Sequence, residues 1–275
     1  MNPRLVAVIG RQRSGTSVLR QFIGSSSRSC DIGEVFHGLT DRTASFWGFL
    51  HARALVNETY RFPPNWILAW QEFIETLSES MAFEVFTFDV KKEYFPIVLR
   101  TNGVRADFFF DSPGIAYIHL RRRNTARQVI SRYVAAATNV WSQTNPEGDV
   151  ERLQWHSQIR GTPPPPRPIE GLTIDPAALL REIDVMHEED EGIENLLGHK
   201  FALRLTYEEL FDEAGNFTET VAAKISGITG IEETEFQKRP ILLKLRQAGV
   251  LEGIENAEEI ISAFRGTGYE WMLNT

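Results

Sequence analysis

The segment of this chain best suited to chemistry is a loop bracketed by two glycines near its start. Apolar residues 5–9 are followed by the sequence Gly10-Arg11-Gln12-Arg13-Ser14-Gly15-Thr16-Ser17. A buried strand that passes through such a loop into a helix presents backbone N–H groups and the positive end of the helix dipole to an anion. Gly10 and Gly15 permit the tight turn and the close approach that a phosphate needs. The spacing therefore predicts a phosphate-binding loop.

The cation of this loop distinguishes it from the loop of nucleoside triphosphatases. Their pattern is Gly, four residues and Gly-Lys-Ser/Thr, whereas here Thr16 takes the place of the lysine and Arg13 comes two residues before Gly15. A triphosphatase uses that lysine on the β- and γ-phosphates, and it holds magnesium with a hydroxyl and an acidic strand end. The departure favours a nucleotide without a γ-phosphate.

A second candidate phosphate site follows the apolar run 115–120. Three consecutive arginines, 121–123, come next, and Ser131 lies eight residues after Arg123. At a strand-to-helix turn this spacing sets a guanidinium at the strand end and a hydroxyl about two helical turns further on, on nearly the same side, so both can hold one phosphate. Cations at a helix N-terminus oppose the helix dipole unless an anion is present, which favours a binding role.

Together the two motifs resemble those of sulfotransferases, the enzymes that use 3′-phosphoadenosine 5′-phosphosulfate (PAPS). In that family a Lys or Arg before Ser/Thr-Gly-Ser/Thr holds the 5′-phosphosulfate, and an Arg with a Ser eight residues later holds the 3′-phosphate. Order and spacing along nearly the whole chain are similar to the bacterial sulfotransferases related to trehalose 2-sulfotransferase. The further matching segments are 32–37 (Ile-Gly-Glu-Val-Phe-His), 88–91 (Phe-Asp-Val-Lys), 128–141, 205–210 (Leu-Thr-Tyr-Glu-Glu-Leu), 254–256 and 266–273.

The resemblance implies an activity, a cofactor and a set of site residues. The activity is transfer of a sulfuryl group from PAPS to a hydroxyl of a carbohydrate or glycosylated metabolite, with no metal required. The donor-binding residues are Arg11, Arg13, Ser14, Gly15, Thr16, Ser17, Arg123 and Ser131, with Lys238 and Arg239 at a late basic position. The candidate catalytic residues are Arg13, Glu34, His37 and Lys91.

Several alternatives stay open at this point. Glu34 matches the family's general base, and His37, three residues further on, is the rival base. Trp141 or Tyr207 could pack against the adenine. A P-loop-type small-molecule kinase and a non-catalytic nucleotide-binding protein are the alternative functions. His119 is expected to face the sheet core, and no histidine of the chain has metal-ligand spacing.

Composition and charge favour an ordinary cytoplasmic enzyme over other classes. The chain has 275 residues, of which 42% are hydrophobic and 24% are charged, enough for one substantial core. The single cysteine, Cys30, fits a reducing compartment, and the net charge of −8 argues against a nucleic-acid partner. No leader precedes the first strand, and no apolar run approaches a membrane span. The sequence leaves the acceptor's identity and the oligomeric state open, a homo-oligomer included.

The elements that must position these residues follow from periodicity. Short apolar runs alternate with helical stretches, which predicts a single α/β domain over residues 1–275 with a P-loop-like central parallel sheet flanked by helices. Strands are expected at 4–10, 84–91, 115–120 and 200–206. Helices are expected at 15–25, 45–57, 65–81, 123–140, 176–197, 216–227 and 256–264.

Two further segments allow two interpretations each. The proline-rich stretch near 161–171 must be extended and exposed, and it is either a surface connection or a lid. The aromatic residues of the second and third helices, Phe46, Trp47, Phe49, Trp66, Trp70 and Phe73, follow helical spacing. Such spacing is typical of core packing, and the same residues could instead line the acceptor pocket.

Overall fold

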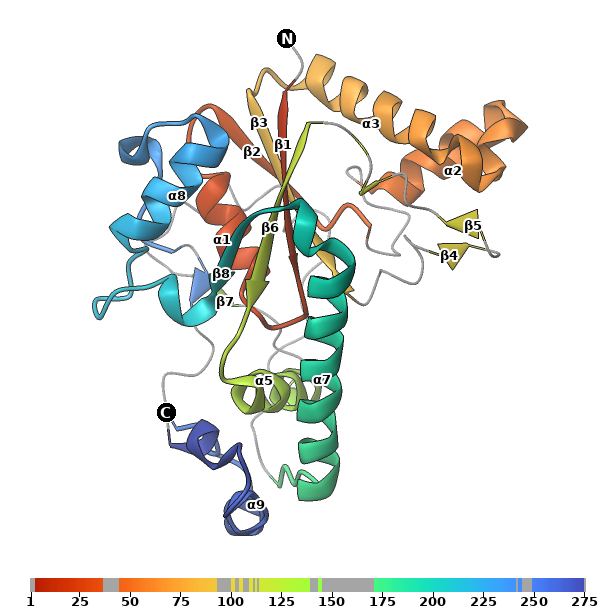
Figure 1. Cartoon of the computed structure of the whole chain (residues 1–275). Coiled ribbons are helices and arrows are strands. Elements are labelled where there is room, and N and C mark those ends of the chain that lie inside the picture. The colour runs from red at the N-terminus through yellow and green to blue at the C-terminus, as the bar shows by residue number, and fades with distance from the viewer. Residues whose placement is uncertain are drawn as a thin grey trace.

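The computed structural model of the chain describes residues 3–36, 45–92, 100–101, 104–105, 109–110, 112, 114–138, 143–144, 171–240, 242–243 and 249–274. In these residues five parallel strands form a central sheet in the order β2-β3-β1-β6-β8 (Figure 1). The strands are β1 (Arg4–Gly10), β2 (Ser29–Gly33), β3 (Val85–Lys91), β6 (Ile115–Arg121) and β8 (Phe201–Thr206). The expected α/β class with a parallel sheet is confirmed, and the order of the strands is consistent with a P-loop-like fold.

The four strands predicted from apolar runs are all present, and the edge strand β2 was missed. Its sequence Ser29-Cys30-Asp31-Ile32-Gly33 has no apolar run, because it pairs only with β3 at the edge of the sheet. Its register also shifts between Asp31 and Gly33. Four two-residue strands were missed for the same reason: β4 (Arg100–Thr101) with β5 (Val104–Arg105), and β7 (Gln143–Thr144) with β9 (Leu242–Leu243).

The helices lie where the sequence predicts them, with ends that differ by a few residues. They are α1 (Thr16–Ile23), α2 (Phe46–Val56), α3 (Trp66–Ser80), α5 (Thr125–Thr138), α7 (Pro176–Leu197), α8 (Glu219–Thr229) and α9 (Ala257–Phe264). Local signals explain their limits. Asp175 caps α7 by accepting from the Ala177 N–H at 2.9 Å, and Pro176 occupies its first turn. Gly230 ends α8 in the left-handed conformation.

Alternating side chains of the strands build one core on each face of the sheet. Leu5, Ala7 and Ile9 of β1 face a cluster formed with α2, α3 and the end of α7. Val6 and Val8 face the opposite cluster, formed with α1 and α8. The first cluster is rich in aromatic residues, among them Phe46, Trp66, Trp70 and Phe73, which are buried. These four residues therefore belong to the core, in agreement with their helical spacing.

A third apolar cluster lies beyond the carboxyl ends of the strands. It joins α5, α7 and α9, and Figure 1 shows α5 and α9 below the ends of β1 and β6, while α7 runs from that level upward beside the sheet. The chain leaves β1 for β2 and β3 on one side and reaches β6 and β8 on the other, so the strand order reverses next to β1. In open α/β sheets such a reversal leaves a crevice at the carboxyl ends of the strands, where ligands bind. The topology thus directs attention to the end of β1.

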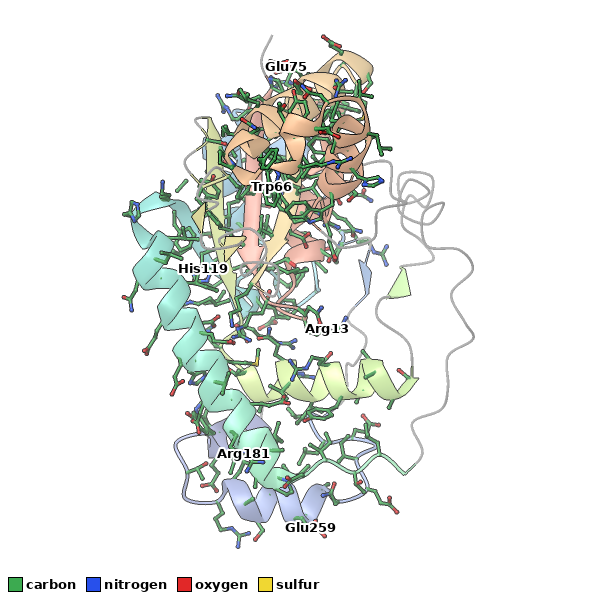
Figure 2. All side chains as sticks on the ribbon, turned by 90° about the vertical axis from the view of Figure 1, so that its right-hand side faces the viewer. Arg13, Trp66, Glu75, His119, Arg181 and Glu259 are labelled. Carbon is green, nitrogen blue, oxygen red and sulfur yellow. The ribbon has the colours of Figure 1, made fainter. Side chains whose placement is uncertain are left out.

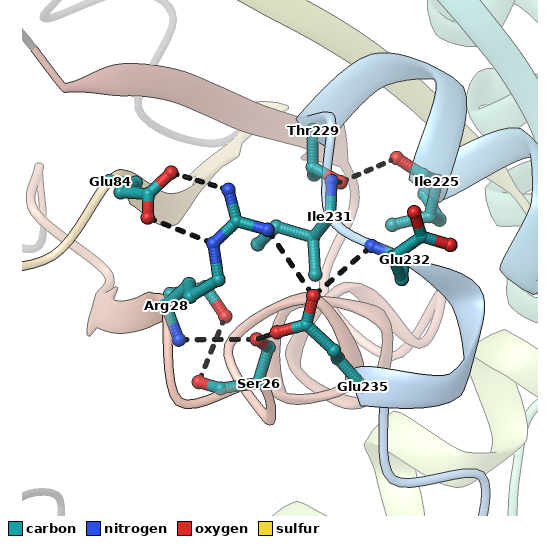
Figure 3. Close-up of polar contacts among 9 residues, drawn as sticks. Ser26, Arg28, Glu84, Ile225, Thr229, Ile231, Glu232 and Glu235 are labelled. Atoms are coloured by element: carbon teal, nitrogen blue, oxygen red, sulfur yellow. Dashed lines mark hydrogen bonds and ion pairs between the residues drawn. The ribbon is translucent and has the colours of Figure 1, made fainter.

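At the amino ends of β2 and β3, partly exposed ion pairs join neighbouring segments (Figure 3). Arg28, just before β2, donates Nη2 and Nε to the two carboxylate oxygens of Glu84 at 2.6 and 2.8 Å. Its Nη1 lies 3.2 Å from the carboxylate of Glu235. This arginine joins the starts of β2 and β3 to the short helix Glu233–Glu235.

One sequence prediction falls almost entirely outside the described residues. Of the proline-rich stretch near 161–171, only Gly171 is described. Among the described residues, none of the helices has the length and apolar character needed to cross a membrane.

Candidate functional site

The predicted phosphate loop connects β1 to α1, and both of its glycines are required by close contacts. A Cβ on Gly10 would lie 2.7 Å from the carbonyl oxygen of Leu120 and 2.7 Å from Cγ2 of Thr16. Gly15 has a φ of 95° and begins α1, and a Cβ there would run into the ring of Tyr207. Both positions therefore demand glycine, as the loop pattern predicts.

The start of α1 carries no side-chain cap, and within its first turn the Val18 N–H donates to the carbonyl oxygen of Gly15 at 3.1 Å, so Thr16 and Ser17 supply the N–H groups nearest the loop. The hydroxyl of Ser14 donates to the carbonyl oxygen of Arg11 at 2.8 Å and stabilises the turn, and the predicted contact of Ser14 with the donor stays a prediction. The Thr16 hydroxyl accepts a hydrogen bond from the ammonium of Lys91. Ser17 is half-buried in the first turn of α1. An uncapped helix start of this kind provides N–H donors and positive potential for an anion.

Arg13 lies at the centre of the site and links the loop to α5. It adopts a φ of 65°, the one positive value for a non-glycine among the described residues. Its Nε and Nη2 both donate to Oγ of Ser131, each at 3.1 Å. Gln128 of the same helix donates Nε2 to the carbonyl oxygen of Gln12 at 2.7 Å. Non-glycine residues in this conformation concentrate at functional sites, where surrounding contacts hold them.

Arg122 is a second cation at this place. Its Nη1 donates to the carbonyl oxygen of Arg13 at 3.3 Å, and its guanidinium lies 4.6 Å from the centre of the Tyr207 ring. Burial lowers the pKa of both arginines, and the charge of Arg122 lowers the pKa of Arg13 further. The Nε of Arg122 is buried with no hydrogen-bond partner in the described part of the chain. Two cations this close in a half-buried place favour a bound anion.

Arg123, the arginine chosen from the sequence, lies differently. Its side chain is 64% exposed, and its Nε is 3.8 Å from the carboxylate of Glu208. That carboxylate also accepts the backbone N–H groups of Arg123 and Asn124 at 3.0 and 3.1 Å, so it holds the turn that leads into α5. The described contacts bring Ser131 to Arg13, not to Arg123. A role of Arg123 in donor binding stays a prediction.

The candidate catalytic residues Glu34 and Lys91 lie together next to α1. Lys91 ends β3, and parallel pairing places it beside Gly10 at the end of β1. Its ammonium lies 2.7 Å from Oδ2 of Asp89 and 3.9 Å from Oε1 of Glu34. With the Thr16 contact, these distances assemble a carboxylate, an ammonium and a hydroxyl from three elements. Such a set can hold and move a proton while it stabilises negative charge.

Arg11 is directed to α7. Its guanidinium pairs with Glu189, and its Nε lies 3.3 Å from Oδ1 of Asp190. Lys92 pairs with the same Glu189. Burial raises the pKa of Asp190, and the charge of Arg11 opposes that rise. These contacts give Arg11 a role in holding α7 against the loop, whereas its predicted contact with the donor stays untested.

The late basic residues lie by α8 and α1. The ammonium of Lys238 pairs with Glu219 at the start of α8. Arg239 lines a small hollow with Val18 and Gln21 of α1. Their contact with a 3′-phosphate stays a prediction. His37 and Trp141 lie outside the described residues.

His119 faces the sheet core, as expected. Its Nδ1 lies 3.0 Å from the carboxylate of Glu194, and its ring stacks on Phe201 with centres 4.7 Å apart. Burial lowers its pKa. In the described part of the chain, His, Cys, Asp and Glu side chains form no group of three or more that could hold a metal ion.

Three residues near the loop were missed as site residues: Arg122, Asp89 and Arg20. Asp89 had a readable signal, since a carboxylate between Phe88 and Val90 is costly in a buried strand and requires a partner. Arg20 of α1 supplies part of that partner, with Nη1 2.8 Å from Oδ1 of Asp89. Figure 2 shows Arg13 between the sheet and α5.

No family model matches this sequence, and no curated protein matches it.

Proposed function

We propose that this chain transfers a sulfuryl group from PAPS to a hydroxyl of a carbohydrate or glycosylated metabolite. The observation that carries the proposal is the contact between its two phosphate motifs, Arg13 of the loop with Ser131 of α5 at 3.1 Å. One ribose carries both the 3′- and the 5′-phosphate of the donor, so the groups that bind them must lie close together. A contact between residues 118 positions apart brings the two motifs to one place.

The residues around that contact fit the donor's charges. The first turn of α1, with Arg13, would hold the 5′-phosphosulfate, because N–H donors and a guanidinium converge there. Ser131 would hold the 3′-phosphate through its hydroxyl hydrogen, with Arg122 or Arg123 as the cation. Tyr207 is already packed between Gly15 and the Arg122 guanidinium, which favours support of the loop over contact with adenine.

Lys91 separates this proposal from a magnesium-dependent kinase. Such enzymes hold the metal between a loop hydroxyl and an acidic strand end. In this loop the residue that corresponds to the metal-holding hydroxyl is Ser17, and the acid is Asp89, whose Oδ2 lies 2.7 Å from the Lys91 ammonium. A carboxylate already held by an ammonium is a poor ligand for a divalent cation, so this set of residues favours a nucleotide that needs no magnesium.

In the proposed reaction the acceptor oxygen forms a bond to sulfur while the bond from sulfur to the bridging oxygen of PAPS breaks. The acceptor's proton passes to the Glu34 carboxylate, and adenosine 3′,5′-bisphosphate leaves with the electron pair of the broken bond. Lys91, Arg13 and the N–H groups of α1 stabilise the negative charge that grows on the leaving phosphate and the sulfuryl oxygens. His37 is the alternative base.

A thermal-shift comparison of nucleotides tests the donor class. Adenosine 3′,5′-bisphosphate should raise the melting temperature without magnesium, because a ligand that binds the native state stabilises it. ATP with magnesium should have the smaller effect. The opposite order, or ATP hydrolysis, would favour the kinase. Binding of the bisphosphate without turnover on any alcohol or sugar would favour a non-catalytic nucleotide-binding protein.

Two substitutions test the assignment of the site. Arg123→Ala should weaken binding of adenosine 3′,5′-bisphosphate by about 2 kcal/mol through loss of a charge-assisted contact. Arg181→Ala, which changes an exposed arginine near the start of α7 (Figure 2), is the matched control and should leave the affinity unchanged. Unchanged affinity in Arg123→Ala would pass the role to Arg122.

Glu34→Gln should leave the bisphosphate affinity intact and lower turnover by roughly a hundredfold, as loss of a general base does. Turnover is followed with labelled PAPS and the acceptor that a library of sugars and alcohols supplies. If His37→Asn alone produces that loss, His37 is the base.

A further inference from the structure

A chain of buried charges runs behind the loop from α1 to the end of β3. Arg20 places Nε 2.6 Å from Oδ1 of Asp31 and Nη1 2.8 Å from Oδ1 of Asp89. The other oxygen of Asp89, Oδ2, lies 2.7 Å from the ammonium of Lys91. The side chains of Arg20, Asp89 and Lys91 are 3%, 0% and 6% exposed. Water therefore contributes little to the solvation of these charges.

Burying the Asp89 carboxylate costs solvation free energy, which suggests that this charge has a specific role. It stands in β3, where all seven residues are buried, and a buried carboxylate must be compensated by neighbouring cations. Arg20 already has a carboxylate partner in Asp31, so its own charge does not require Asp89. The second oxygen of Asp89 is the one that reaches Lys91. Asp89 therefore contacts two cations: Arg20 fixes the carboxylate, and the carboxylate fixes the ammonium of Lys91.

The effect on Lys91 is to fix a long and flexible side chain at one place. Its ammonium contacts the Thr16 hydroxyl in the first turn of α1. The nearest other carboxylate, Glu34, is 3.9 Å away. Without the Asp89 carboxylate, the remaining acid at Lys91 is the proposed base, and a full ion pair with Lys91 would draw Glu34 away from an acceptor.

We propose that Asp89, held by Arg20, is a positioning residue of this site: it holds the Lys91 ammonium at the Thr16 hydroxyl, against the transferred group of the donor. This inference rests on the proposed function. It makes the ammonium a resident cation, fixed before the donor binds, at Thr16, the loop position where nucleoside triphosphatases carry their lysine. Preorganised charge of this kind is worth more than charge that must be ordered during the reaction.

A double-mutant cycle on PAPS affinity, measured by calorimetry without acceptor, tests the inference. Lys91→Met should weaken PAPS binding by about tenfold, since it removes one charge-assisted contact to the sulfuryl group. Asp89→Asn should weaken it by nearly as much, because it releases the ammonium that makes this contact. The double variant should also lose about tenfold, because Asp89 acts through Lys91. Affinity for adenosine 3′,5′-bisphosphate, which lacks that group, should change by less than about threefold. Losses that multiply to about a hundredfold would overturn the inference.

Controls separate positioning from general damage. Glu84→Gln likewise replaces a carboxylate by an amide, in the side chain that pairs with Arg28 at the amino ends of β2 and β3 (Figure 3). It should leave both affinities unchanged. If Asp89→Asn does not fold, the double variant Arg20→Gln with Asp89→Asn, which removes both charges together, takes its place. The cycle then compares wild type, Lys91→Met, this double variant and the combination of all three substitutions. Equal losses for PAPS and the bisphosphate would also contradict the inference. Failure of the wild-type protein to bind the bisphosphate would instead reject the proposed function.

Discussion

Two arginines of this molecule, Arg20 and Arg28, are each held between two carboxylates, near opposite ends of the neighbouring strands β2 and β3. Arg28 pairs with Glu84 and Glu235 at the amino ends of the strands, where its side chain is 38% exposed and that of Glu84 is 52% exposed. Arg20 pairs with Asp31 and Asp89 near the carboxyl ends, where it is buried. The local chemistry is the same, whereas the surrounding solvent differs.

The difference teaches what each pair can do. An exposed ion pair gains little, since water solvates the charges equally well when they are apart. A buried pair is not a cheap source of stability either, because desolvation offsets most of the attraction, but removing one partner leaves an uncompensated charge. The Arg20 cluster is thus a costly arrangement that fixes charge beside the loop, while the Arg28 cluster joins surface segments. The following variants test that contrast.

The largest effect is expected from Arg20→Ala. It leaves the carboxylates of Asp31 and Asp89 buried without their arginine, and the free energy of unfolding should fall by about 3–5 kcal/mol. Urea unfolding followed by tryptophan fluorescence measures the change. A loss below about 1 kcal/mol would place this cluster in the same class as an exposed pair.

A smaller loss is expected from Asp31→Asn. Arg20 keeps its contact with Asp89, so only one charge-assisted hydrogen bond is weakened, and the free energy of unfolding should fall by about 1.5 kcal/mol. The same urea titration gives the value. A loss equal to that of Arg20→Ala would show that Asp89 alone does not compensate the arginine.

The smallest effect is expected from Glu84→Gln, and it should depend on pH. The hydrogen bond from Arg28 lowers the pKa of Glu84 below its ordinary value. Its contribution is therefore present at neutral pH and is lost as the pH falls through that lowered pKa. Wild type and variant should have converging unfolding free energies in acid. High salt should also remove the difference, since exposed pairs are screened. A difference that persists in high salt would contradict the contrast.

The stability of the sheet should also fall in mild acid because of His119. Burial lowers its pKa in the folded state, so the unfolded chain takes up the proton first as the pH falls below about 6.5. Stability is full above that pH and declines toward the folded pKa. His119→Asn should flatten this part of the curve of unfolding free energy against pH, and an unchanged slope would assign it to other groups.

Local pattern was sufficient for the framework of this fold. Apolar runs located β1, β3, β6 and β8, and the spacing of Gly10 and Gly15 located the loop, because these features depend on neighbouring residues. The edge strand β2 was missed, since pairing with β3 and not its own composition makes it a strand.

The sequence could not decide which of three consecutive arginines turns toward the loop. That choice depends on Tyr207 and Glu208, which come from a distant segment: the first packs against Arg122, and the second pairs with Arg123 and holds the turn before α5. The charge at Asp89 was visible in the sequence, but its partner Arg20 lies on another element. Residue types therefore located the candidate site, whereas the contacts within it depend on residues that are distant in the sequence.

The ion pairs of Arg11 attach the loop directly to α7. Arg11 and Lys92 both hold Glu189, and α7 extends over 22 residues, about 33 Å at the rise of an α-helix. A displacement of Arg11 would therefore strain these ion pairs or move α7 with it. In this way Glu189 connects the loop at the end of β1 to the whole length of α7.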